Sequence, residues 1–344
     1  MNAGPAPEWA PAIPVVQAPM AGGASTPELA AAVSEAGGLG FLAAGYRTAG
    51  RMRADIERTR ELTSRPFGVN LFMPSSDAVD DAAVAAYRAR LGAEGGRLGV
   101  EPGTPQARDD GWDAKAADLL ADPPAFVSVT FGCPGAGLVR AFRRAGAVVI
   151  VTVTTADEAR EAAGAGADAL CVQGMEAGAH RGSFTNTGEG ALPLRALLAA
   201  VREVVGGLPL IAAGGLGTAA QVADVLALGA VAAQCGTAFL RCPESGASAV
   251  HKEALADPRF TETAMTRAFS GRPARGLVNR FLVEHSPHAP AAYPDVHYVT
   301  SPLRKAAAAQ GDPDAVNLWA GEAFRSAADA PAAEIVAALA AGTA

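Results

Sequence analysis

The sequence has no feature of a disulfide-linked or zinc-binding protein. Its 344 residues include only four cysteines, and no two of them form a CxxC pair. Isolated cysteines beside apolar runs usually behave as small hydrophobic side chains. We therefore predict free, buried thiols at Cys133, Cys171, Cys235 and Cys242.

The chain also lacks an excess of basic residues and any long apolar run. Its formal net charge is −7, and its arginines are scattered between acidic residues, so nucleic acid is not an expected partner. No stretch of about 18 residues is apolar without a charge or a glycine-rich break. Residues 1–13 carry no basic region followed by an apolar segment, as a secretion signal would. These absences predict a soluble cytoplasmic protein without membrane contact.

Apolar sequence is instead divided into short runs. Half of the residues are hydrophobic and only 18% are charged, a balance that suits a parallel sheet covered by helices on both faces. Eight such runs are candidate strands: Val15–Met20, Leu39–Ala44, Phe67–Phe72, Ala125–Thr130, Ala147–Val151, Ala169–Val172, Pro209–Ala212 and Val231–Gln234.

Amphipathic helical patterns separate these runs, for example over Thr26–Ala36, Ala156–Ala163 and Leu192–Val205. Helix start signals agree, because Thr26 precedes Pro27 and Thr155 opens a capping-box pattern. Alternation of strand and helix implies parallel pairing and predicts a single (β/α)8 TIM barrel. An open doubly wound sheet is the main rival, but no GxGxxG follows the first run.

Two segments depart from this alternation. Residues 74–124 contain helical runs at Asp80–Leu91 and Trp112–Leu120 around Gly- and Pro-rich sequence, and we interpret them as an elaborated third crossover. After Leu240 no further barrel strand is evident. We expect residues 1–243 to form the barrel and residues 244–344 to form a segment of helices and loops packed on its side or mouth.

The loops after the seventh and eighth strands are rich in glycine. Gly214 and Gly215 follow the seventh strand, and Gly236 and Thr237 follow the eighth. Glycines let backbone N–H groups approach an anion closely, and these two loops are the usual phosphate site of a TIM barrel. We therefore predict a phosphate site here, against the alternative that the glycines only make tight turns.

Amide side chains stand at other strand ends, where barrel active sites lie. Asn70 ends the third strand and Gln173 ends the sixth, and their donors and acceptors match the mixed edge of a flavin or a base. Beyond Gln173, a glycine-flanked loop carries His180 beside Arg181, where a histidine can act as a base or hold an anion. No histidine pair has HExxH-type spacing, so we predict no metal.

Six ordered motifs carry a resemblance to a known family. On them the chain resembles the nitronate monooxygenases, formerly called 2-nitropropane dioxygenases, which are FMN-dependent TIM barrels. The motifs are QAPMAGG (17–23), GVNLF (68–72), GMEAGAHRG (174–182), AAGGL (212–216), QCGTAFL (234–240) and SGRPARGLVN (270–279).

The resemblance implies a flavin site and a reaction. His180 would be the catalytic residue, and the family oxidises alkyl nitronates such as propionate 3-nitronate with oxygen to a carbonyl product and nitrite. The implied partners are thus a small anionic substrate and oxygen. The implied FMN contacts are Ala18, Pro19, Met20, Ala21, Asn70, Gln173, Gly178, Gly214, Gly215, Gln234, Cys235, Gly236 and Thr237.

Two positions depart from the family pattern. Thr130 stands where some members have a histidine, and Glu322 stands where glutamine is expected. A carboxylate at the mouth would disfavour an anion, whereas a protonated His180 or Arg181 would favour one. A neutral nitroalkane would instead require His180 as the base that removes its α-proton.

Three other functions remain open at this point. The nearest is an FMN-dependent enoyl-ACP reductase that takes electrons from a nicotinamide, because its barrel and histidine motif are similar. The second is a barrel that binds a phosphorylated metabolite without flavin, such as a sugar-phosphate isomerase. The third is a flavoprotein that stores or senses FMN without turnover.

Overall fold

Eight parallel strands form a closed barrel at the centre of the protein, in a computed structural model that describes residues 7–75, 77–187 and 191–342. The strands follow the order β1, β9, β8, β6, β5, β4, β3, β2, and a parallel bridge from Val16 to Leu39 joins the last to the first. The predicted TIM barrel is therefore confirmed. The strands are β1 (Val15–Gln17), β2 (Gly40–Ala43), β3 (Phe67–Phe72), β4 (Phe126–Thr130), β5 (Val148–Val153), β6 (Ala169–Gln173), β8 (Leu210–Ala213) and β9 (Ala232–Cys235).

Helices cover the outside of the barrel. Threonine caps begin two of them as the sequence indicates: Thr26 Oγ1 accepts from Leu29 N at 3.0 Å and Thr155 Oγ1 from Glu158 N at 3.2 Å. The Glu158 carboxylate accepts from Thr154 N, one residue before the cap, so the pattern is shifted from an ordinary capping box. The helices are α1 (Pro27–Glu35), α2 (Ala49–Leu62), α5 (Trp112–Ala121), α6 (Ala136–Arg144), α7 (Ala156–Ala165), α8 (Leu194–Val205) and α9 (Ala219–Ala227).

Side chains fill both faces of the sheet. Alternate residues of β6 show this, because Leu170 and Val172 pack outward against the helices while Cys171 points into the barrel interior. Such burial on both faces explains the continuous apolar runs in the sequence. The four cysteines are free; Cys171, Cys235 and Cys242 are buried as expected, but Cys133 is only half-buried.

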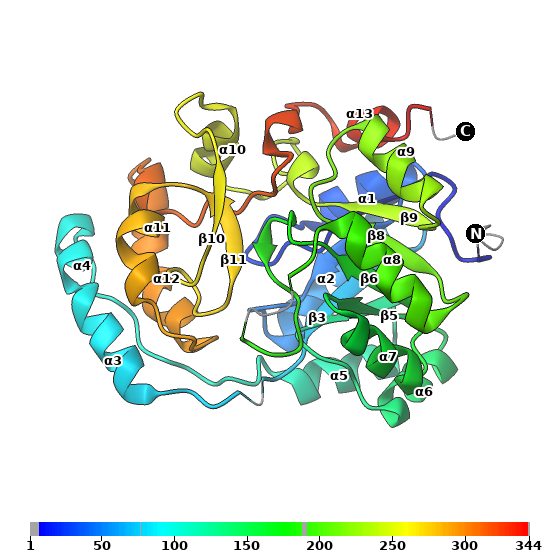
Figure 1. Cartoon of the computed structure of the whole chain (residues 1–344), viewed down its shortest axis with the longest axis horizontal. Coiled ribbons are helices and arrows are strands. Elements are labelled where there is room, and N and C mark those ends of the chain that lie inside the picture. The colour runs from blue at the N-terminus through cyan, green and yellow to red at the C-terminus, as the bar shows by residue number, and fades with distance from the viewer. Residues whose placement is uncertain (1–6, 76, 188–190, 343–344) are drawn as a thin grey trace.

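A second lobe stands beside the barrel mouth and is built from two distant parts of the chain. It combines the insertion helices α3 (Asp81–Arg90) and α4 (Gly92–Leu98) with most of the C-terminal segment, and Figure 1 shows these elements to the left of the barrel. From here on we call it the second lobe. Its C-terminal elements are α10 (Ala249–Ala256), β10 (Thr263–Thr266), β11 (Ala274–Leu277), α11 (Arg280–His285) and α12 (Asp295–Ala309).

The two strands of this lobe correct the expectation of helices and loops alone after Leu240. The strands β10 and β11 pair in antiparallel fashion, and β11 also pairs with the short β7 (Ala179–His180), where Ala274 lies opposite His180. The two strands were missed because their four-residue sequences, TAMT and ARGL, show no clear apolar alternation. Through β7 the second lobe is hydrogen-bonded to the loop that follows β6.

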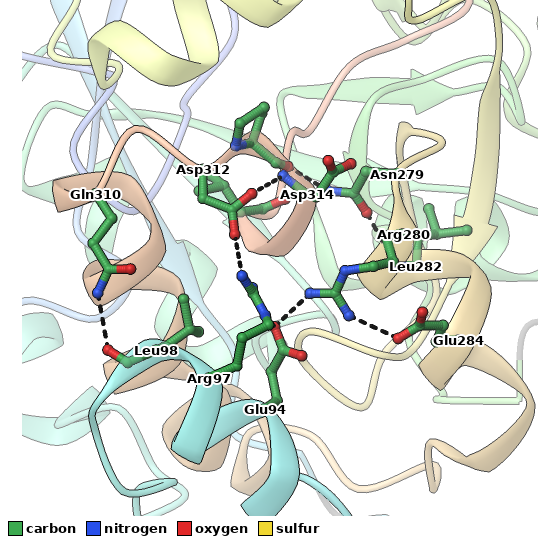
Figure 2. A network of polar contacts seen from close by, with 12 residues as sticks. Glu94, Arg97, Leu98, Asn279, Arg280, Leu282, Glu284, Gln310, Asp312 and Asp314 are labelled. Carbon is green, nitrogen blue, oxygen red and sulfur yellow. Dashed lines mark hydrogen bonds and ion pairs between the residues drawn. The ribbon is translucent and has the colours of Figure 1, made fainter.

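Ion pairs hold the insertion to the C-terminal segment. The buried Glu94 carboxylate of α4 accepts from Arg97 and from Arg280 of α11, each at 2.6 Å, and Arg97 also contacts Asp312 at 2.8 Å (Figure 2). Burial alone would raise the pKa of Glu94, but the bonds from Arg280 and Arg97 outweigh it and hold that pKa below its usual value.

The last helix, α13 (Ala332–Leu339), leaves the second lobe and packs back on the barrel against α1 and α9. In Figure 1 it lies above α9. Within the described ranges, no helix is long and apolar enough to cross a membrane.

Candidate active site

The two glycine loops meet at the carboxyl ends of β8 and β9. Gly214 and Gly215 have φ of 120° and 66°, the left-handed region in which a side chain is strained. A Cβ on Gly215 would lie 2.8 Å from Glu176 Cβ. Within the described residues, the N–H groups of Gly214, Gly215 and Gly236 donate no hydrogen bond. Three free donors on loops that follow two neighbouring strands form a cradle suited to a phosphate group.

The loop after β6 and a segment near the C-terminus close over this cradle. A Cβ on Gly178 would lie 2.4 Å from Gly321 N and 2.6 Å from the Ala320 carbonyl carbon, so only glycine fits. Gly321 N in turn donates to Thr237 Oγ1 at 3.0 Å. The structure thus brings Gly178 and Thr237 together as the sequence indicated, and adds Gly321, which no sequence motif identified.

The turn after β1 lies beside the second glycine loop. Gly236 approaches Ala18, where an added Cβ would lie 3.4 Å from Ala18 Cβ. Ser25 fixes the turn, because its hydroxyl accepts from Met20 N at 2.9 Å and from the buried Gln17 amide at 2.9 Å. Ala18, Pro19, Met20 and Ala21 are all half-buried, so part of the surface of each is accessible.

Asn70 keeps only part of its hydrogen-bonding capacity for a ligand. Its amide nitrogen donates to Ser128 Oγ at 2.9 Å and to Thr130 Oγ1 at 3.0 Å, whereas its oxygen has no partner within the described residues. Thr130, the residue that replaces the histidine of some relatives, therefore orients Asn70 and lies 3.3 Å from Thr152 Oγ1. Asn70 offers an acceptor at the mouth.

The other two amides also have protein partners. Gln173 donates to the His180 carbonyl at 3.1 Å and accepts from Gly182 N at 2.7 Å, so it orders the histidine loop. Each amide nitrogen carries two protons, so one N–H of Gln173 remains. Gln234 donates to Cys171 Sγ at 3.2 Å, and its side-chain oxygen accepts no hydrogen bond from the described residues. Cys235 is buried, and burial raises the pKa of its thiol to about 12.

His180 lies where the barrel and the second lobe meet. Its Nε2 is 2.9 Å from Ser270 Oγ of the second lobe, while Gln173 of the barrel holds its carbonyl. Burial and the nearby Arg272 and Arg304 lower the pKa of His180 to about 3. The ring is therefore neutral at ordinary pH, which argues against a protonated His180 as the anion-binding group.

Aromatic rings surround the imidazole of His180. The rings of Phe131, Tyr293 and Trp319 have centroids 5.8, 5.5 and 5.7 Å from its own. Tyr293 Oη donates to Tyr46 Oη at 3.0 Å, which extends this wall to the loop after β2. These residues come from four separate chain segments, and the sequence assigned none of them a role.

Arg272 and Arg304 both bring positive charge near His180, and Arg272 is the one that stacks on this wall. Its guanidinium lies 4.1 Å from the Phe131 ring centroid and donates to the carbonyls of Arg181 and Ser183. Arg272 is 1% exposed, and no carboxylate lies within 4 Å of it in the described residues. Burial lowers its pKa to about 10, so the group stays cationic at neutral pH. Arg181 instead reaches the Thr154 carbonyl at 3.3 Å.

Backbone strain is concentrated at this mouth. Within the described residues, the non-glycine positions with positive φ are Tyr46, Asp110, Phe131 and Ala179. Ala179 precedes His180, and Tyr46 and Phe131 belong to the aromatic wall, while Asp110 Oδ1 accepts from Tyr46 N at 2.9 Å. Such conformations cost about 1–3 kcal/mol each and typically mark functional sites.

The carboxylate of Glu322 does not stand alone. It lies 3.2 Å from Arg275 Nη2, and the Glu322 backbone N–H donates to the Glu176 carbonyl at 3.1 Å. The ion pair offsets the charge that was expected to disfavour an anion.

Comparison with known proteins agrees with this geometry. The family model described as nitronate monooxygenase matches residues 7–342. A nitronate monooxygenase of Pseudomonas aeruginosa is 43% identical over 336 residues, which cover 94% of each chain. The chain belongs to the nitronate monooxygenase family.

Other members and neighbours extend this assignment. A probable nitronate monooxygenase of Staphylococcus aureus is 36% identical and covers 94% of this chain and 92% of its own. The solved nitroalkane oxidase of Streptomyces ansochromogenes is 54% identical, with a TM-score of 0.94 over 97% of this chain and 96% of its own. FabK of Thermotoga maritima is 26% identical, with a TM-score of 0.74 over 97% of this chain and 93% of its own. The sequence-based family prediction is confirmed.

Proposed function

We propose that the protein is an FMN-dependent nitronate monooxygenase, which oxidises alkyl nitronates with oxygen to a carbonyl product and nitrite. The observation that carries the proposal is the cradle of free N–H groups at Gly214, Gly215 and Gly236, which opens beside the half-buried His180. Family membership supports the reaction class, and the cradle supports a phosphate-bearing cofactor.

The proposed roles of the barrel residues follow from their free hydrogen-bonding groups. Gly214, Gly215 and Gly236 would hold the phosphate, with Gly178 and Thr237 beside them. Ala18–Ala21 would line the cofactor. Asn70 and Gln234 would each contribute a side-chain oxygen as an acceptor, and Gln173 would contribute its remaining N–H as a donor. Bound FMN supplies the two-electron redox chemistry of the reaction.

His180 and Arg272 divide the work on the substrate. A neutral His180 has a lone pair that can take the α-proton from a neutral nitroalkane, which converts it to the nitronate. Arg272, which has no carboxylate partner within ion-pair distance in the described residues, favours the negative charge that develops. A preformed nitronate needs no proton transfer and depends on the charge and shape of the site alone.

An anaerobic mixing experiment tests the proposal. The purified protein should be yellow and should release FMN, identified by mass, on denaturation. Under anaerobic conditions, propionate 3-nitronate should bleach the flavin absorbance within a catalytic turnover time, and oxygen should restore it. Protein that neither contains FMN nor takes it up would refute the cofactor assignment, and bleaching by NADPH with no response to nitronates would refute the reaction.

The same experiment separates the main alternative, an FMN-dependent enoyl-ACP reductase. This reading is less well supported, because the nitroalkane oxidase structure is 54% identical to the chain and the FabK structures only 26%.

A further inference from the structure

Ser270 places a hydroxyl against the imidazole of His180. The two residues are 90 positions apart in the chain, and pairing of β7 with β11 brings them together. Ser270 is 1% exposed, and its Oγ lies 2.9 Å from His180 Nε2 and 3.2 Å from the Arg272 carbonyl oxygen. One hydroxyl proton must therefore serve one of two neighbours.

The Arg272 carbonyl decides which neighbour receives this proton. Within the described residues, Ser270 Oγ is the one donor that reaches this oxygen, and Arg272 is almost fully buried. A buried carbonyl left without a donor is destabilising. When Ser270 donates to Arg272, its lone pairs face His180, so Nε2 must carry the ring proton and donate it.

The opposite arrangement leaves two groups unsatisfied. If Ser270 donated to Nε2, the Arg272 carbonyl would lose its donor and Nδ1 would carry the ring proton. Nδ1 has no hydrogen-bond partner within the described residues, and its surroundings include the rings of Phe131, Tyr293 and Trp319. This arrangement gives the Nδ1 proton no acceptor from the described residues, whereas the Nε2–H tautomer gives both the ring proton and the Ser270 proton a protein acceptor.

We propose that Ser270 is a positioning residue that holds His180 as the Nε2–H tautomer, which leaves the Nδ1 lone pair as the proton acceptor. The tautomer follows from contacts within the chain, whereas its use in catalysis rests on the proposed function. In that use the α-carbon–hydrogen bond of a nitroalkane breaks, its electron pair forms the carbon–nitrogen double bond of the nitronate, and the proton bonds to Nδ1. The resulting imidazolium still donates from Nε2 to Ser270.

Gln173 completes the arrangement by holding the backbone of the same residue. It donates to the His180 carbonyl and accepts from Gly182 N, so the barrel fixes the main chain while the second lobe fixes the ring. Orientation of a base by a further group is a general device for selecting one histidine tautomer.

Nitrogen-15 NMR of the FMN-loaded protein, labelled in its five histidines, measures the tautomer directly. The His180 signals are assigned by their loss in His180→Gln. We expect a pyrrole-type signal for Nε2 and a pyridine-type signal for Nδ1 in the wild type. In Ser270→Ala the two signals should move toward a mixture of tautomers, and Ser270→Thr should restore them. An Nδ1–H tautomer in the wild type, or an unchanged spectrum in Ser270→Ala, would overturn the proposal.

Kinetics test the consequence separately. Ser270→Ala should lower kcat with a neutral nitroalkane at least about 10-fold, because the wrong tautomer cannot accept the proton. Its oxidation of a preformed nitronate and its FMN content should change less than about twofold. Ser286→Ala, which removes a serine hydroxyl elsewhere in the second lobe, is the matched control and should leave both activities unchanged.

The two measurements fail independently. If neither substrate reduces the flavin in the wild type, the proposed function is wrong while the NMR spectrum still decides the tautomer. If Ser270→Ala does not fold, the wild-type and Ser270→Thr spectra decide it. Equal losses with nitroalkane and nitronate would show a merely structural role and would contradict the positioning role.

Discussion

The barrel and the second lobe differ in how far apart in the sequence their contacts lie. Most neighbouring barrel strands are joined through one helix, so those pairings close a short stretch of chain; the exceptions are the β3–β4 connection, which carries the insertion, and the pairing of β1 with β9 that closes the barrel. In the second lobe, Tyr87 Oη donates to the Ala268 carbonyl across 181 positions, and Gln310 donates to the Leu98 carbonyl across 212. The barrel repeats a local pattern, whereas the lobe depends on matches between distant segments, and His180 lies between the two.

The largest expected effect on stability comes from replacing Lys115, a buried lysine on the barrel helix α5. Lys115 of α5 is 1% exposed and donates to the Ala44 carbonyl at 2.9 Å and to Asp110 Oδ2 at 2.7 Å. Lys115→Met leaves Asp110 partly buried and unpaired, so we expect a loss of about 3–5 kcal/mol in the free energy of unfolding. Urea unfolding measures it, and Lys305→Met, at an exposed lysine of α12, is the control with little change. A loss below about 1 kcal/mol would show that the pair is dispensable.

Acid should weaken the second lobe before the barrel. Burial lowers the pKa of His251 to about 4 and also lowers the pKa values of His285 and His297. In the unfolded chain these histidines take up protons below about pH 6.5, but the folded state does not, so stability falls as pH falls from 6.5 toward 4. His251 alone should then cost about 2 kcal/mol by pH 5, and His285 and His297 should add to this loss. Hydrogen exchange should quicken first in α10 to α12, and equal exchange in both regions would contradict the comparison.

The next largest effect is expected at Gly178, where the loop after β6 packs against the backbone of Ala320 and Gly321. Gly178→Ala places a Cβ against the backbone of Ala320 and Gly321, and relief of this clash costs about 1–3 kcal/mol. We expect FMN to bind about 10-fold more weakly, as measured by fluorescence titration of the apoprotein. Gly137→Ala, on α6 with nothing within 4 Å of the added atom, serves as the control. Equal FMN affinity in both variants would remove Gly178 from the cofactor site.

The smallest effect concerns the ion pairs of the second lobe. Glu94→Gln removes the charge between Arg97 and Arg280 but keeps one acceptor, so we expect a loss of about 1 kcal/mol. Faster hydrogen exchange should be confined to α3, α4 and α11. Glu61→Gln, at an exposed pair on α2, should change nothing. Uniform destabilisation of the barrel by the Glu94 variant would show that the two regions unfold together.

The contrast between local contacts in the barrel and long-range contacts in the second lobe explains what could be predicted from the sequence. Strand runs and helix caps are local, so the barrel and its two glycine loops were predicted closely, although β1 ends at Gln17 rather than Met20. His180 was singled out as a candidate because a histidine in a glycine-flanked loop is a local signal. Ser270, Tyr293 and Arg272 were not assigned roles, because only pairing of β7 with β11 and folding of the insertion bring them to His180.

The most direct test of the account compares two substrates on one variant. If His180 is the base at the junction of barrel and second lobe, His180→Ala with FMN bound should lose at least about 100-fold in the anaerobic rate of flavin reduction by a neutral nitroalkane. Its rate with the preformed nitronate should fall much less, because that substrate has already lost its proton. Equal rates in the variant and the wild type with the nitroalkane would contradict the account.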